Sequence, residues 1–274
     1  MKNKTPRLFL MLLLFLGLSS HDMFLKLDSY FLEPNSDQII KLYNGTFDKS
    51  ENSITRDRML DVSIIDGNGS VSHSDNSHWS DVDDQTLLKF KTSGEGTYLG
   101  ALSTAARTFD LSAEDFNGYL KHDGILDVYE QRKKEGTLDQ DATEMYSKHV
   151  KILFQVGDKR TGGFDRVLGY PIEFIALKNP YEMKVGDELE FQLLKKGEPL
   201  AGQLVYASCG GYHEHDDSGG HVEAVKNETD SQGKFKIKLT SKGHWYVRAI
   251  NMVKPPADDV DYESNWATLT FEIK

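Results

Sequence analysis

Trp245-Tyr246-Val247-Arg248-Ala249 is the stretch that decides the fold, because apolar side chains occupy every second position in it. Successive side chains of a β-strand point to opposite faces, so this spacing predicts a strand with one buried face. The same period recurs in Leu189–Leu193, Phe235–Leu239 and Leu269–Ile273. We therefore expect a Greek-key β-sandwich without a helix at the end of the chain. Its predicted core is Leu189, Phe191, Leu193, Phe235, Ile237, Leu239, Trp245, Val247, Leu269, Phe271 and Ile273.

The first half of the chain shows the same alternation in short segments. They are Met23–Leu27, Gln38–Leu42, Leu60–Ile65 and Leu87–Lys91. Turn-forming sequences such as Asp66-Gly67-Asn68-Gly69 separate them, at spacings typical of a sandwich. This half is predicted to form another antiparallel β-sandwich.

Residues 112–148 instead have sequence features that are typical of helices. Ser112 followed by Asp115 has the form of a helix start, and Gly124 is expected to end the first helix. The apolar positions at helical spacing are Phe116, Tyr119 and Leu120. The charged segments that also favour helix are 127–135 and 139–148. We expect an α-helical insertion here, which acts as a lid or as a brace that only packs.

A linker between the two sandwiches is predicted at Asn179-Pro180, because proline cannot continue a hydrogen-bonded ladder. The predicted fold class is mainly β, with two antiparallel β-sandwich domains, the first of which carries the helical insertion. The predicted boundaries are 1–20 for a signal peptide, 21–178 for the N-terminal sandwich and 179–274 for the C-terminal Greek-key sandwich.

The first twenty residues have the three-part layout of a secretory signal peptide. The positive charges come first, then an apolar run from Leu8 to Leu16, then small residues. This run is too short for a membrane helix, which needs ~20 residues, and no cysteine for lipid attachment lies near the junction. We expect a periplasmic or secreted protein with no membrane span after cleavage. The positive charges are those of Lys2, Lys4 and Arg7, and the small residues near the cleavage site are Gly17, Ser19 and Ser20.

The mature chain is expected to be strongly acidic. Cleavage removes three positive charges, which changes the formal net charge from −11 to −14. This charge argues against binding to nucleic acid or to an anionic membrane surface, and it favours metal cations, cationic ligands or neutral partners. Cys209 is the only cysteine, so no internal disulfide forms and an apolar core must stabilise the chain.

The richest cluster of metal-ligand residue types is the segment 212–221, which holds His213, His215 and His221 together with three carboxylates. Imidazole is the commonest protein ligand of zinc, copper, nickel and cobalt. The glycine pair Gly219-Gly220 can fold His221 back toward the other two. The alternative is a solvated polar loop that binds divalent ions only weakly.

His21 is the other metal candidate. If cleavage follows Ser20, His21 offers both its α-amino group and its ring to one cation. Cleavage after Ser19 would satisfy the preference for small residues better and would leave His21 second. The predicted metal ligands are thus His21, His213, His215 and His221, and the predicted cofactor is a divalent transition metal ion, namely nickel, cobalt, copper or zinc.

The other histidines and Cys209 have simpler explanations. His73 and His78 flank a turn that is expected to be exposed, and capping explains His122 and His149 at the edges of the helical insertion. Cys209 is expected to be a buried, inert thiol. No nucleophile elbow, phosphate-binding glycine loop or zinc-protease helix is present, so we expect no catalytic activity. A copper oxygenase would need a second histidine opposite His21, for which the sequence has candidates but no signature.

The segment 196–202, followed by 229–235 and 243–248, resembles a transthyretin-like or carboxypeptidase-regulatory-like sandwich. The chain as a whole resembles a bacterial family known as a domain of unknown function, DUF4198. That resemblance rests on His21–Phe24, Leu168–Glu173, Gly197–Gly202 and Tyr262–Phe271. It implies a periplasmic component of nickel or cobalt uptake, whose partner is a membrane metal transporter or another envelope protein. Where the family is expected to have a histidine before a methionine, this chain has Asn251-Met252, so a metal site that uses that histidine is altered or absent here.

Two hypotheses follow for the function. The first is an exported periplasmic protein that binds a divalent transition metal of the nickel or cobalt type and assists its uptake or homeostasis. The second is a non-catalytic envelope module that binds a protein or a glycan and has no metal role. Neither hypothesis involves nucleic acid.

Overall fold

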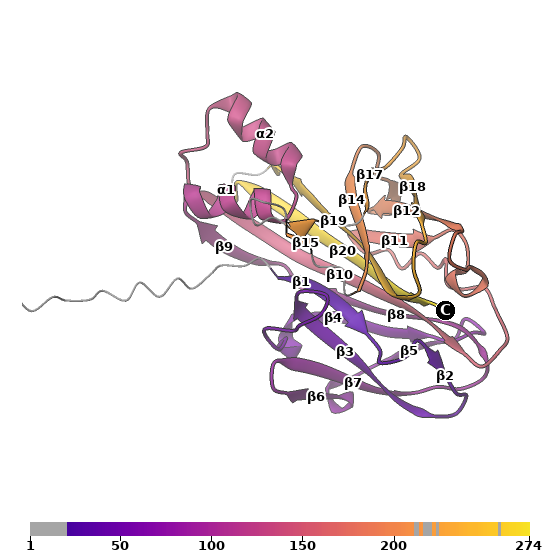
Figure 1. Cartoon of the computed structure of the whole chain (residues 1–274). Helices are drawn as coiled ribbons and strands as arrows, with labels where there is room; N and C mark the ends of the chain where they lie inside the picture. Colours follow the sequence, from indigo (N-terminus) through magenta and orange to yellow (C-terminus); the bar gives the residue numbers. More distant parts are fainter. Residues whose placement is uncertain (1–20, 211–213, 216–220, 223–224, 257–258) are drawn as a thin grey trace, which may run out of the picture.

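The computed structural model describes residues 21–210, 214–215, 221–222, 225–256 and 259–274. This part of the chain is mainly β, with several sheets and two α-helices (Figure 1). The predicted fold class, a mainly β chain with antiparallel sheets and inserted helices, is confirmed.

A four-stranded antiparallel sheet, the first sheet, begins the fold. Its strand order is β1-β3-β7-β6, and its alternating apolar residues Ile40, Leu42 and Leu88 are fully buried. The strands are β1 (Asp22–Lys26), β3 (Asp37–Gly45), β6 (Trp79–Val82) and β7 (Gln85–Lys91). Two single 3-10 turns, η1 (Arg56–Arg58) and η2 (Asn76–His78), lie in the connections.

A ten-stranded sheet, the central sheet, has the order β17-β14-β19-β20-β10-β8-β4-β5, and β2 and β9 also pair with β10. Its strands are β2 (Phe31–Leu32), β4 (Met59–Ile65), β5 (Val71–His73), β8 (Gly96–Thr104), β9 (Arg107–Leu111), β10 (Ala142–Val156), β14 (Leu204–Cys209), β17 (Val225–Glu228), β19 (Gly243–Val253) and β20 (Tyr262–Ile273).

A smaller four-stranded sheet, the third sheet, pairs β12 with β11, β13 and β18. These strands are β11 (Ile172–Ala176), β12 (Glu188–Lys195), β13 (Glu198–Pro199) and β18 (Lys234–Lys238), and η3 (Pro180–Glu182) lies between the first two. A short hairpin pairs β15 (Glu214–His215) with β16 (His221–Val222).

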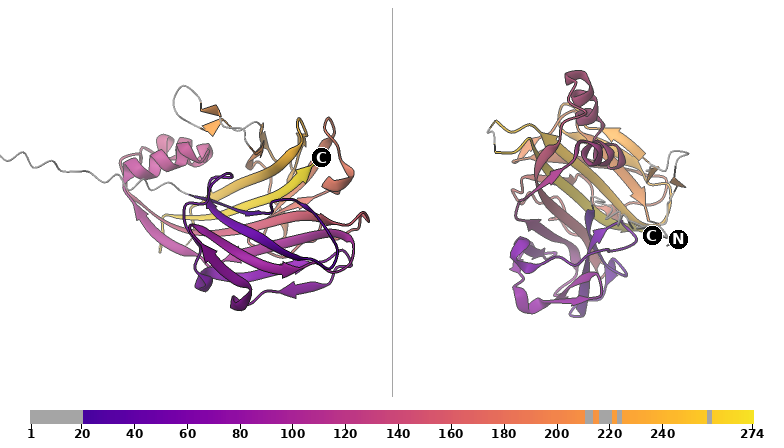
Figure 2. Two further views of the ribbon diagram at one scale, coloured as in Figure 1. Left: turned by 60° about the horizontal axis from the view of Figure 1, so that its bottom comes forward. Right: turned by 90° about the vertical axis from the view of Figure 1, so that its left-hand side faces the viewer.

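The first and third sheets pack on opposite faces of the central sheet (Figures 1 and 2). On one face, the hydroxyl of Thr268 in β20 donates to the carbonyl of Met23 in β1 at 2.7 Å. On the other face, the ring of Phe271 in β20 lies 5.8 Å from the ring of Phe191 in β12. Each sheet thereby buries its apolar side chains against the central one.

The core predicted for the C-terminal half is confirmed. All eleven of its residues are buried, and the most accessible of them, Phe235, is 5% exposed. They belong to one apolar cluster that also includes buried residues of the first sheet. Period-two spacing identified these positions because each contributes to the same strand face.

The helical insertion is shorter than predicted. Its two helices are α1 (Ala113–His122) and α2 (Leu126–Glu135). The prediction that 139–148 favours helix is wrong, because residues 142–148 belong to β10. Over residues 142–148, β10 pairs with β9 and β20, and this pairing outweighs the local preference of a charged sequence for helix.

The central sheet runs across the predicted domain boundary at Asn179. Nine residues of β20, Tyr262–Thr270, pair in parallel with Glu144–Ile152 of β10. Upstream of the boundary, β11 pairs with β12 of the third sheet. The division into two folding units at this position stays a prediction.

Candidate functional site

A cavity of about 350 Å³ lies on the face of the central sheet that also carries the first sheet and α1. We call it the insertion cavity. It is lined by His21, Asn44, Arg58, Arg107, Thr108, Phe109, Leu111, Tyr119, Glu144, Tyr146, Lys148 and Trp266. Its floor comes from β9, β10 and β20, and its walls from α1, η1 and the edges of β1 and β3.

Strand register explains why these side chains converge. Glu144, Tyr146 and Lys148 alternate along β10 and therefore share one face. Their partners are Phe109 and Arg107 of β9 for the first two, and Trp266 of β20 for Lys148. In a sheet, paired residues point to the same side, so charged and aromatic groups from three strands meet there.

Lys148 is a buried cation, with 4% of its surface exposed. Its ammonium donates to the backbone carbonyl of His21 and, at 3.4 Å, to Oδ1 of Asn44. It also lies 4.9 Å from the centre of the Trp266 ring. Burial disfavours the charged form and lowers the pKa of Lys148 to about 8.

Glu144, four residues earlier on the same strand, is fully buried. Its Oε1 accepts hydrogen bonds from the hydroxyls of Tyr119, at 3.1 Å, and Ser264, whereas its Oε2 has no partner among the described residues. Burial raises the pKa of Glu144 to about 7. This carboxyl therefore holds its proton far more readily than an exposed glutamate does.

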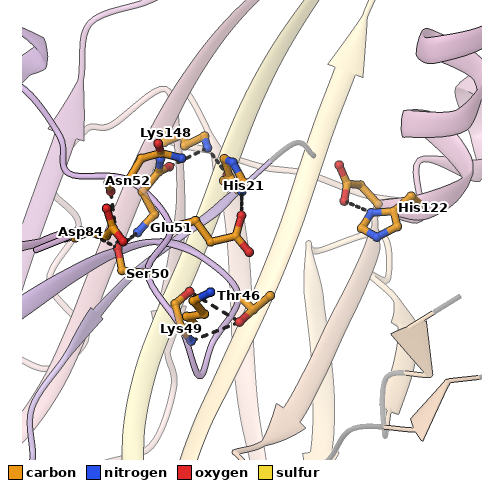
Figure 3. Close-up of polar contacts among 11 residues, drawn as sticks. His21, Thr46, Lys49, Ser50, Glu51, Asn52, Asp84, His122 and Lys148 are labelled. Atoms are coloured by element: carbon orange, nitrogen blue, oxygen red, sulfur yellow. Dashed lines mark hydrogen bonds and ion pairs between the residues drawn. The ribbon is translucent and has the colours of Figure 1, made fainter. Parts of the chain in front are cut away.

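His21 lies at the start of β1, where the mature chain is expected to begin. Its Nδ1 lies 3.2 Å from Oε2 of Glu51, and burial lowers its pKa (Figure 3). The neighbouring carboxylate of Asp22 is buried and faces Arg248, with 3.5 Å between Oδ2 and Nε. Its Oδ1 has no hydrogen-bond partner in the described part of the chain, and burial raises the pKa of Asp22.

His122 ends α1 and Asp123 follows it, and Figure 3 shows His122 apart from the His21–Glu51 pair. Nδ1 of His122 lies 2.9 Å from Oδ1 of Asp123, and this hydrogen bond raises the pKa of His122. The Asp123 side chain is 7% exposed, and its Oδ2 is buried without a partner. The charge of Asp123 acts on both His21 and Asp22, which shows that the two pairs share one electrostatic environment.

Of the predicted metal ligands, His21 is the one whose side chain is described. His213 lies outside the described residues. His215 and His221 are cross-strand partners in the β15–β16 hairpin, and their side chains are not among those described. Within the described part of the chain, no three His, Cys, Asp or Glu side chains are gathered closely enough to hold a metal ion. Whether the predicted set binds metal stays a prediction.

Capping is the wrong explanation for His149. It is a buried residue within β10, where Nδ1 lies 2.9 Å from the hydroxyl of Ser103 and Nε2 lies 2.9 Å from that of Ser147. At Asn251, where the resemblance predicts histidine, the side-chain amide donates to Gln203 and accepts from Lys195.

The sequence reasoning missed most of this site. Asp22 and the pair His122–Asp123 had no motif to distinguish them, although Asp22 adjoins His21. Glu144 and Lys148 were assigned to a helix, and their period-two spacing with Tyr146 was the pattern that could have placed them together on a strand.

Matches to solved structures have low identity. Salmonella alpha-2-macroglobulin is 10% identical, with a TM-score of 0.23 over 91% of this chain and 15% of that chain. The D0-D1 domain of intimin is 12% identical, with a TM-score of 0.20 over 91% and 97%. The Yersinia pseudotuberculosis adhesin InvE is 10% identical, with a TM-score of 0.24 over 92% and 61%. A search of curated proteins finds no match.

Two further observations concern the chain as a whole. Among the described residues, no helix has both the length and the apolar character needed to cross a membrane. Residues 18–253 match the family described as a domain of unknown function, DUF4198, and this confirms the resemblance found in the sequence. Since the match covers most of the chain, the protein belongs to the DUF4198 family.

Proposed function

We propose that this chain is an exported envelope protein that binds a divalent transition metal ion at its mature N-terminus and assists uptake or homeostasis of that metal. The observation that supports the proposal is the electrostatic coupling at the N-terminal end of β1, where Asp123 acts on both His21 and Asp22, and His122 acts on Asp22.

The donor chemistry of this group suits a transition metal. Asp22 Oδ1 and Asp123 Oδ2 are buried without a hydrogen-bond partner in the described structure, and a cation would satisfy both. Imidazole nitrogens and carboxylate oxygens together suit nickel, cobalt, copper or zinc. Nδ1 of His122 is engaged by Asp123, an arrangement that orients the ring and leaves Nε2 as its ligand atom. In His21, the nitrogen that can chelate together with the residue's own α-amino group is Nδ1, so metal binding would replace the contact of Nδ1 with Glu51.

The α-amino group is an essential part of the proposal. The described side chains do not by themselves bring three ligands together. Cleavage after Ser20 would place a free amine on His21 itself, so that the amine and the ring chelate one ion. The proposed ligand set is therefore the His21 amine and imidazole together with His122.

Calorimetric titration of the mature protein with nickel, cobalt, copper and zinc tests this proposal, after mass spectrometry has established that the chain begins at His21. We expect one ion per chain for at least one of these metals, with a dissociation constant in the micromolar range or below. His21→Ala and His122→Ala should each weaken binding at least about tenfold, as should a Gly-Ser extension before His21 that removes the chelating amine.

His73→Ala is the matched control, because His73 is exposed and pairs with Asp61 of the neighbouring strand β4, not with any of the proposed ligands. It should bind metal like the unaltered protein. A variant with His213, His215 and His221 all replaced by alanine tests the histidine-rich loop separately. If only that variant lost metal binding, the metal site would lie in the histidine-rich loop and not at the N-terminus. Binding no tighter than millimolar for all four metals would contradict the metal function and favour the alternative, an envelope module that binds a protein or a glycan.

A further inference from the structure

We propose that the insertion cavity binds a small organic carboxylate with an apolar body. This ligand goes beyond the proposed metal function and does not depend on it. The charges, the unsatisfied groups and the aromatic surface of the cavity suit such a ligand.

The lining charges favour an anion. Arg58 and Lys148 are 6% and 4% exposed, and Arg107, which pairs with Asp57 at 3.3 Å, adds a third cation at an exposed position of the lining. Glu144 is the only carboxylate among the described residues that line the cavity, and burial raises its pKa to about 7, which reduces its negative charge. In a chain whose formal net charge is −11, this is a local concentration of positive charge.

Neither buried cation is neutralised by a direct ion pair with a carboxylate of the described residues. Arg58 donates from Nη1 to the Tyr146 hydroxyl at 3.1 Å and from Nη2 to the Ala105 carbonyl at 3.5 Å. Its Nε is buried and has no partner in the described structure. Asp22 and Asp123 act on Lys148 electrostatically, but they are not among the lining residues. Buried charges that lack a partner are costly, and a bound anion would pair with both.

The size and the walls of the cavity select the kind of anion. About 350 Å³ falls in the range of sites that hold small organic molecules. Aromatic rings form much of the wall, from Phe109, Tyr119, Tyr146 and Trp266. An inorganic ion would leave this surface uncovered, whereas an organic acid would place its carboxylate on the guanidinium fork of Arg58 and its carbon body against the rings.

The experiment uses the mature protein freed of metal and then of chelator by dialysis, so that failure of the metal function does not affect it. Benzoate and hexanoate are titrated calorimetrically beside their neutral amides, benzamide and hexanamide, and beside inorganic phosphate. We expect at least one carboxylate to bind about tenfold or more tightly than its own amide, because only the anion forms charge-assisted hydrogen bonds. Phosphate should bind more weakly than that carboxylate.

Variants locate the site. Arg58→Gln and Lys148→Met should each weaken carboxylate binding about tenfold or more. The matched control is Arg56→Gln, which alters a neighbouring residue of η1 that pairs with Asp81 and does not line the cavity. Because Arg58 is buried, its variant can fail to fold, which circular dichroism would show. Arg107→Gln is the second test, since Arg107 lines the cavity from an exposed position and its replacement removes a cation without altering the buried charges, so carboxylate binding should again weaken.

The inference is overturned if no carboxylate of the panel binds, if acid and amide bind equally, if phosphate binds as tightly as the acids, or if the folded cavity variants bind like the control. Carboxylate binding without metal binding would support this inference and contradict the proposed function. Metal binding without carboxylate binding would contradict this inference alone.

Discussion

The imidazole of His149 lies inside β10, between two serine hydroxyls and out of contact with water. Burial disfavours its charged form and lowers its pKa to about 4. His122, which is partly exposed, has a raised pKa because it bonds to Asp123. The two residues thus respond to acid in opposite directions, although both were first expected to be caps.

His149 should make folding sensitive to mild acid. Near neutral pH it is uncharged in both the folded and the unfolded chain. Below pH 6.5, the ordinary pKa of histidine, His149 is protonated in the unfolded chain. In the folded chain it is protonated only near pH 4. Above pH 6.5, neutral His149 therefore makes its full contribution to the free energy of unfolding. That contribution, about 3 kcal/mol, is lost as the pH falls from 6.5 to 4.

The measurement is the free energy of unfolding from urea titrations between pH 4 and 8, for the unaltered protein and for His149→Gln. Glutamine keeps hydrogen-bonding capacity without a titrating ring. We expect the difference between the two curves to change by about 3 kcal/mol across this interval, with the variant gaining relative stability in acid. Parallel curves would show that His149 is not the sensitive group.

At the scale of elements, the end of α1 places Asp123 where its charge acts on His21. Gly124 follows it with φ of +74°, a left-handed conformation that suits glycine. Its backbone carbonyl accepts a hydrogen bond of 2.8 Å from the hydroxyl of Tyr206 in β14. A side chain at this position would approach that hydroxyl to 2.3 Å. The turn therefore fixes the helix against the central sheet.

Gly124→Ala should destabilise the chain by about 1–3 kcal/mol, from the left-handed strain and from displacement of Tyr206. Gly136→Ala is the matched control, because Gly136 follows α2 with φ of +69° and has open space where a side chain would go. Gly136→Ala should lower the free energy of unfolding only by the strain of a left-handed alanine, about 1 kcal/mol. Thermal unfolding of both variants measures the difference, and equal losses would show that contact with Tyr206 has no energetic role.

At the scale of the whole molecule, the parallel pairing of β10 with β20 joins strands from both halves of the chain into one sheet. One apolar cluster continues through all three sheets. Because the two halves share hydrogen bonds and a core, we expect the mature chain to unfold in a single transition. Bound metal should add little to this core, since its proposed site lies at the start of β1.

Trp245→Ala tests this coupling. Trp245 is fully buried in β19, and its removal should lower the free energy of unfolding by ~3–5 kcal/mol. Unfolding followed by far-ultraviolet circular dichroism and by hydrogen exchange of β1 amides should shift together. If the N-terminal amides kept their protection while the C-terminal half unfolded, the two halves would be independent units.

Much of the fold could be predicted because its pattern is local. Period-two spacing in Phe191, Trp245 and Phe271 reports which face of a strand is buried, and no other part of the chain is needed to recognise it. The same reasoning failed for 139–148. There, charged residues favour helix locally, and the neighbouring strands that impose an extended chain are distant in sequence.

The mainly β class, the core of alternating apolar residues and the candidate ligand His21 could all be predicted from the sequence, since each conclusion depends on residues close together in the chain. Where the charges come together depends instead on the folded chain. Asp22, Asp123 and Lys148 come from β1, the end of α1 and β10, and nothing in their spacing brings them together. Sheet pairing and helix packing do so, because side chains from remote segments become neighbours only when their backbones are hydrogen-bonded and packed.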